Sequence, residues 1–164
     1  MFLVSLLRLL HIVSAVLWMG IGFTMVVFIQ PAIQNESGFR FMKTLYAKTR
    51  INTAYPVTAV LTTLCGILLY LSGSMNRFSQ TGNIVLGIGA LAGLLAFGHG
   101  AAALGPLTSK LSAQLAAALP EGSTATADSL AMLEMSLAKY QRQARVALVL
   151  TLIALVGMGL ARYL

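Results

Sequence analysis

The fold of this chain is decided by residues 9–29, which read LLHIVSAVLWMGIGFTMVVFI. The run carries no charged residue and is followed by Gln30 and Pro31, a pair that favours the end of a helix. Crossing about 30 Å of hydrocarbon takes roughly 20 helical residues. The stretch therefore predicts a membrane-spanning helix. Because it is much longer than the apolar region of a signal peptide, we expect this helix to remain in the mature protein.

Three further apolar windows have a similar length, at residues 54–71, 82–104 and 144–160. Only helices and closed barrels pair every backbone polar group inside lipid, so we expect these windows to be helical as well. With their extensions, the four helices are predicted at about residues 2–30, 54–72, 82–119 and 127–163. The expected fold is all-α, an integral membrane antiparallel four-helix bundle in one domain, residues 1–164, with a cytoplasmic helical hairpin extension.

The composition supports a membrane protein. Of the 164 residues, 58% are hydrophobic and 9% are charged, and the mean hydropathy is +0.85. A water-soluble domain of this length keeps a large share of its residues at the surface and could not hide so much apolar area. Lipid is therefore the expected solvent, and the bilayer the first expected partner.

Basic residues predict the orientation of the helices. They exceed acidic residues by 11 to 4, and most of them flank the same side of the four predicted spans. That side carries Arg40, Lys43, Lys48, Arg50, Lys110, Lys139, Arg142 and Arg145, whereas the other side carries Arg8, Arg77 and Arg162. By the positive-inside rule, we expect a multi-pass protein of the cell (inner) membrane with both termini outside the cytoplasm. The positive charge is explained by topology, so no nucleic-acid partner is predicted.

The segments outside the spans carry helical patterns of their own. Residues 39–46 place apolar side chains at helical spacing beside basic ones, which is typical either of a helix at the lipid headgroups or of a basic connector. Two leucine stripes, in residues 107–115 and 130–137, are separated by a turn at residues 120–123. We expect the last two helices to leave the membrane as a hairpin that packs on itself. A membrane-protein partner or a second copy of the chain is the alternative for these surfaces.

Several classes of chemistry are not supported by the sequence. All four acidic residues, Glu36, Glu121, Asp128 and Glu134, fall outside the predicted spans, which leaves no intramembrane carboxylate for a proton relay. The sequence also contains no Gly-rich phosphate loop, no Ser-His-Asp set and no Cys/His metal spacing. No enzymatic reaction is predicted from these residues.

The candidate site residues are the two histidines, His11 and His99, which both fall within predicted spans. An imidazole in lipid is costly unless it faces the bundle and finds a partner, so each is a candidate haem-iron or metal ligand. The alternative is helix packing, with each ring bound to a carbonyl or hydroxyl group of a neighbouring helix. His11 lies near the outer side and His99 about 25 Å deep along its helix at 1.5 Å per residue. One haem held by both rings is therefore not expected. We expect either one haem with His11 and a second ligand such as Met19 or Met158, or separate roles for the two histidines.

The first half of the chain also resembles a known group of membrane proteins. Residues 10–20, LHIVSAVLWMG, are similar to the opening helix of copper-resistance D-like proteins and of HemJ-type protoporphyrinogen oxidases, where a histidine is followed by Trp and Gly. Residues 41–46, FMKTLY, and 62–68, TTLCGIL, resemble the loop and second helix of that group. His99 falls where the HemJ type has a third-helix histidine. The resemblance implies a four-helix fold and a b-type haem with His11 as iron ligand.

The chain lacks two features that the HemJ type has in its third and fourth helices. Residues 82–104 contain no lysine, and residues 141–148 contain no Asn-Glu pair, although the HemJ type has both features. Three hypotheses follow for the function. The first is a haem b protein that transfers electrons or handles porphyrin, the second is a cofactor-free subunit of a larger membrane complex, and the third is copper transport.

Overall fold

The computed structural model describes residues 2–72, 81–122 and 124–164. Within these ranges nearly every residue is helical and none belongs to a β-strand. Arg77, used above for orientation, and Ser123, in the predicted turn, lie outside the described residues. The all-helical fold class predicted from the sequence is confirmed for the described part of the chain.

The described residues form five continuous helices, two of which contain a π-helical turn. The first consists of α1 (Phe2–Thr24), the π-turn η1 (Met25–Ile29) and α2 (Gln30–Ala32). It is followed by α3 (Glu36–Lys48) and α4 (Ile51–Ser72). The fourth consists of α5 (Thr81–His99), the π-turn η2 (Gly100–Leu104) and α6 (Gly105–Ala118), and the fifth is α7 (Ala127–Leu160). Four of the five, all except α3, are long and apolar enough to cross a membrane.

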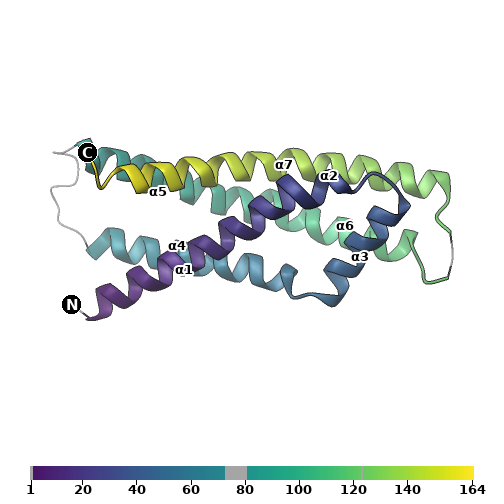
Figure 1. The fold of residues 1–164 in the computed structure, drawn as a ribbon, viewed down its shortest axis with the longest axis horizontal. Coiled ribbons are helices and arrows are strands. Elements are labelled where there is room, and N and C mark those ends of the chain that lie inside the picture. The colour runs from purple at the N-terminus through teal and green to yellow at the C-terminus, as the bar shows by residue number, and fades with distance from the viewer. Residues whose placement is uncertain (1, 73–80, 123) are drawn as a thin grey trace.

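The four long helices run alternately up and down the molecule (Figure 1). Both chain ends lie at one end of the bundle, whereas α3 and the connection from α6 to α7 lie at the other. We call these the terminal half and the α3 half. The closest helix pairs are α1 with α4 and α5 with α7. The bundle is therefore two tightly packed pairs placed side by side.

In the terminal half, α5 and α7 approach each other through glycine. A Cβ atom added at Gly89 would lie 2.9 Å from the backbone nitrogen of Met158, and one added at Gly157 would lie 3.0 Å from the Cα of Gly89. At Gly82, the same atom would lie 2.5 Å from the carbonyl oxygen of Ala161. Small residues are what lets two helix backbones pack this closely in lipid.

In the same half, α1 and α4 are joined by a buried pair of hydroxyl groups. Thr62 Oγ1 lies 2.9 Å from Ser14 Oγ, whose own proton is donated to the carbonyl of Leu10 over 2.6 Å. Both side chains are buried. Thr62 Oγ1 also lies 2.7 Å from the carbonyl oxygen of Thr58 in its own helix. A polar group away from water needs a partner, and both hydroxyls have one at this contact.

The α3 half is held by large apolar side chains. The two leucine stripes pack against each other, as the sequence predicts. Leu133 and Leu137 of α7 contact Leu111 and Leu115 of α6 and Leu119, which directly follows α6. The apolar face of α3 covers this hairpin; its buried residues are Phe39, Met42 and Tyr46. That face therefore lies on protein and not in the lipid headgroups.

Two polar contacts fix α3 in place. The Asn35 side chain accepts a hydrogen bond of 3.0 Å from the backbone nitrogen of Gly38 and so begins the helix. Lys43 Nζ donates to the carbonyl oxygen of Leu119 over 2.6 Å, at the end of α6. The lysine thereby satisfies a carbonyl that has no partner within its own helix.

Both π-turns lie just before a proline. In η1 the backbone nitrogen of Gln30 donates to the carbonyl of Met25, directly before Pro31, and in η2 that of Gly105 donates to Gly100, directly before Pro106. Proline cannot donate a backbone hydrogen bond and crowds the preceding turn. The wider i to i+5 turn accommodates this defect while the helix continues. Both turns border the cavity described next.

Candidate functional site: a cavity between the helix pairs

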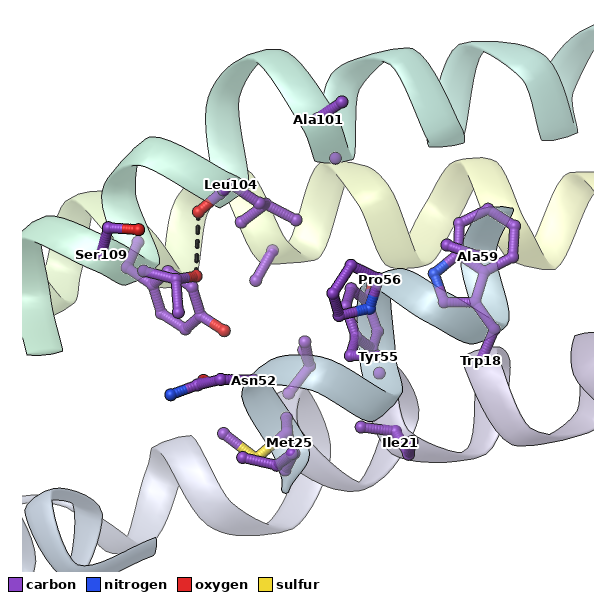
Figure 2. Close-up of a pocket in the computed structure, with 18 of the residues that line it drawn as sticks. Trp18, Ile21, Met25, Asn52, Tyr55, Pro56, Ala59, Ala101, Leu104 and Ser109 are labelled. Carbon is purple, nitrogen blue, oxygen red and sulfur yellow. Dashed lines mark hydrogen bonds between the residues drawn. The ribbon is translucent and has the colours of Figure 1, made fainter. Parts of the chain in front are cut away.

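A cavity of about 680 Å³ lies between the two helix pairs. All four long helices contribute to its walls: the first through α1 and η1, the others through α4, through α5, η2 and α6, and through α7. Tyr46 of α3 lies at one end of the cavity. Figure 2 shows Asn52, Tyr55 and Pro56 on one side and Ala101, Leu104 and Ser109 on the other. This volume is typical of a small-molecule site in a protein.

The cavity is open along one side, between α4 and the segment from η2 to α6. Lining residues on both edges are exposed, among them Pro56 and Val60 on α4 and Ala101, Gly105 and Ser109 on the opposite edge. These two edges make little contact with each other. Because all these residues belong to helices long enough to span a membrane, the opening faces sideways along the bundle.

The described residues that line the cavity carry no charge. They are mostly apolar, with a few hydroxyl, amide and phenol groups among them. A charged molecule buried here would have no partner of opposite sign, which is strongly unfavourable. The lining therefore suits an uncharged molecule.

Three lining side chains bury a hydrogen-bonding atom that has no partner in the described part of the chain. They are the Trp18 indole nitrogen, which lies near the Tyr55 hydroxyl, Gln30 Nε2, and the Tyr46 hydroxyl, which lies near that of Tyr140. Their residues are 7%, 2% and 7% exposed, respectively. An unsatisfied buried donor costs about 1–3 kcal/mol. Each of the three atoms can donate a hydrogen bond to a bound molecule. The Trp18 and Gln30 nitrogens can only donate, whereas the Tyr46 hydroxyl can also accept.

Two of these donors, Gln30 and Tyr46, lie at the α3 end of the cavity. Gln141 Nε2 of α7 donates to the backbone carbonyl of Gln30 over 3.4 Å, and its neighbour Tyr140 packs against Tyr46. Burial raises the pKa of Tyr46 above the ordinary value for a phenol, and the nearby Tyr140 raises it further. Tyr46 therefore keeps its proton at neutral pH and acts as a donor.

The opposite end of the cavity is apolar and is built around Trp18. The indole packs with Ala59 of α4 and Ala96 of α5, and the side chains of Tyr55 and Phe97 pack against this cluster. Figure 2 shows Trp18 beside Ala59 at the end farthest from Ser109. The cavity thus has a polar end near α3 and an apolar end near the middle of the bundle.

His11 lies outside this cavity, in the contact between α1 and α4. Its Nδ1 donates to the backbone carbonyl of Thr62 over 2.8 Å. The ring lies over Gly66, where an added Cβ would be 2.9 Å from His11 Cε1. The hydrogen bond fixes the tautomer and leaves the lone pair on Nε2, as in histidines that bind metals.

His99 lies on the other helix pair. Its Nε2 donates to the backbone carbonyl of Gln143 of α7 over 3.2 Å, which leaves the lone pair on Nδ1. The two histidines therefore bind different helices, and neither lines the cavity. Both make the carbonyl contact that the packing interpretation describes, and their role as ligands stays a prediction.

The other predicted ligands are also separated. Met19 lines the cavity, whereas Met158 packs against Gly89 and Gly93 in the contact between α5 and α7. Across residues 2–72, 81–122 and 124–164, no group of three or more His, Cys, Asp or Glu side chains is placed to hold a metal ion.

Sequence reasoning missed the residues that form the cavity. The sequence predicts Gln30 as the end of a helix and Tyr46 as part of an amphipathic face, whereas both bury a polar atom inside the bundle. The available signal was that Gln30 is a polar residue directly after a predicted span and that Tyr46 carries a hydroxyl on the apolar face of its helix. Comparisons with protein-family models, curated proteins and solved structures found no match to this chain.

Proposed function

We propose that this chain is a multi-pass protein of the cell membrane that binds an uncharged, lipid-soluble small molecule in the cavity between its helix pairs. The observation that carries the proposal is a cavity of about 680 Å³ with an uncharged lining and unpaired buried donors. A ligand dissolved in the bilayer would reach it through the part of the side opening between α4 and η2, whose residues fall within the predicted apolar windows. Basic residues gather in the α3 half, so this half is assigned to the cytoplasmic side.

Trp18 provides a direct test, because it is the chain's only tryptophan and it lines the cavity. The protein is placed in phosphatidylcholine nanodiscs and titrated with 1-bromododecane, an uncharged molecule whose bromine quenches indole fluorescence. We expect saturable quenching. Quenching that only rises in proportion to the probe, as for simple partition into lipid, would contradict the proposal.

A matched pair of variants makes this test specific. Ala101 lines the cavity, whereas its neighbour Ala102 is exposed and does not line it. Ala101→Phe should abolish the saturable part of the quenching by filling the cavity, and Ala102→Phe should leave it unchanged. Equal behaviour of the two variants would show that the probe binds elsewhere.

A second candidate function is a haem b protein with His11 as an axial ligand. It is favoured by the hydrogen bond from Nδ1 to the Thr62 carbonyl, which leaves the Nε2 lone pair for iron. Bound haem would supply one-electron chemistry. The protein purified with haem available should then show a Soret absorption band that is lost in His11→Ala and kept in His99→Ala. A colourless preparation would remove this candidate.

A further inference from the structure

We infer that the α3 end of the cavity recognises a carbonyl oxygen, so that the ligand is an uncharged lipid with a ketone or quinone head and an apolar tail. This inference rests on the function proposed above and adds the chemical class of the ligand. The two recognition groups are Gln30 Nε2 and the Tyr46 hydroxyl, which are buried, line the cavity and complete no hydrogen bond with any described residue.

The head group follows from a balance of donors and acceptors. Gln30 Nε2 can only donate, and Tyr46 has a proton to donate. A carbonyl oxygen accepts two hydrogen bonds and brings no proton that needs a partner of its own. An alcohol would bring such a proton, and a carboxylate or phosphate would bring a charge that no described lining residue can neutralise. A carbonyl therefore pairs both donors without bringing a proton or a charge of its own.

Both donors belong to segments that contacts of their own hold in place. Tyr46 belongs to α3, which Lys43 ties to the end of α6. Gln30 follows the π-turn η1, and its backbone carbonyl accepts a hydrogen bond from Gln141, next to the Tyr140 ring that packs on Tyr46. A site fixed in this way loses little conformational entropy when it binds its ligand.

The rest of the cavity fits a tail. Twelve residues separate Gln30 from Trp18 along the first helix, a distance of about 18 Å at 1.5 Å per residue. The lining residues on that stretch, Met19, Ile21, Gly22, Met25 and Val26, are apolar or small. The head would lie near α3 and the tail would extend toward Trp18.

The inference is tested with a decyl-substituted benzoquinone, which is uncharged, bears carbonyl groups and quenches tryptophan. Binding is followed through Trp18 in the full-length protein in nanodiscs. Gln30→Leu and Tyr46→Phe should each weaken saturable quinone quenching by about tenfold, the usual effect of losing a hydrogen bond to a buried group. Gln34→Leu, at an exposed position on the same segment, and Tyr163→Phe, at the exposed C-terminal end, should have no effect.

Competition separates the possible head groups. A ketone, 2-dodecanone, should displace the quinone at lower concentration than dodecanol or dodecanoate, which have tails of similar length. The inference is overturned if dodecanol or dodecanoate displaces the quinone as well as the ketone does, or if both cavity variants bind it like the wild type.

The bromododecane experiment distinguishes this failure from that of the proposed function. If bromododecane binds saturably in Gln30→Leu and Tyr46→Phe while quinone affinity is also unchanged, the cavity binds lipid-soluble molecules without recognising a carbonyl. If neither probe saturates in the wild type, both proposals fail. Circular dichroism of the two variants checks that they remain folded.

Discussion

The terminal half and the α3 half of this bundle pack by opposite means. In the terminal half, backbones meet at Gly89 and Gly157, and polar contacts such as Ser14 with Thr62 cross the gap between helices. In the α3 half, large side chains such as Leu133 and Met42 fill the space between helices that lie farther apart. The comparison shows that helices in close backbone contact at one end of a bundle can separate toward the other end, and that a cavity can form where they separate.

The difference follows from the solvent expected at each end. Between helices in lipid, apolar side chains gain little by leaving the bilayer, so small residues and hydrogen bonds hold the contact. The α6–α7 hairpin and α3 extend beyond the predicted apolar windows, where we expect water, and there burying leucine would remove it from that water. Each half therefore uses the interaction that is effective in its surroundings, and the predictions below test that division.

The largest loss of stability should come from the α3 half. Leu133 is fully buried, and Leu133→Ala should lower the free energy of unfolding by about 3 kcal/mol through lost burial and a new cavity. Unfolding in denaturant, followed by circular dichroism in detergent micelles, measures this change. Met135→Ala is the control, since Met135 is 70% exposed, and it should cost far less. Equal losses would show that the hairpin is not a packed core.

A smaller loss is expected from the glycine contact in the terminal half. Gly89→Ala places a methyl group against the backbone of α7 and should cost about 2 kcal/mol of stability, because the two helices must separate. The same unfolding measurement applies. Gly98→Ala has open space around the added atom and should raise stability slightly, by about 0.5 kcal/mol, since alanine favours a helix. A stabilising Gly89→Ala would refute the close backbone contact.

The buried hydroxyl pair should contribute less again. Thr62→Val keeps the shape of the side chain, removes the bond to Ser14 and should cost about 1 kcal/mol. A double-mutant cycle with Ser14→Ala isolates the coupling between the two residues. Thr44→Val, at an exposed site where the hydroxyl bonds only to its own helix, is the matched control. A coupling energy near zero would show that the pair does not hold α1 to α4.

The smallest effect is a pH dependence in the α3 half. Burial raises the pKa of Tyr46 in the folded state, so the unfolded chain loses this proton first as the pH rises. Stability from Tyr46 is therefore constant below about pH 9 and falls as the pH rises further, by about 0.4 kcal/mol at pH 10. Tyr46→Phe should remove this part of the alkaline slope in unfolding experiments. A variant with the same slope as the wild type would indicate that Tyr46 is accessible to water.

Much of this architecture could be predicted from hydropathy, and the cavity could not. Long apolar windows indicate spans because length and composition decide whether a helix can cross a bilayer, and the leucine stripes of the hairpin have a regular spacing. The π-turns depend on how each proline is accommodated by its own helix, which residue type alone does not determine. The donor role of Gln30 depends in turn on the direction that η1 gives it. The histidines show the same limit, since their carbonyl partners are backbone atoms without a sequence signature.

The two π-turns make the polar end of the cavity sensitive to chain length. Each π-turn contains one residue more than the α-helical turn it replaces. Deleting that surplus residue would rewind the helix and rotate everything beyond it by about 100°, the angle between successive residues of an α-helix. In the first helix the rotation would carry Gln30 off the cavity wall; in the fourth it would turn the α6 stripe away from α7. A single-codon deletion at either place would thus erase the site while leaving the hydropathy profile almost unchanged.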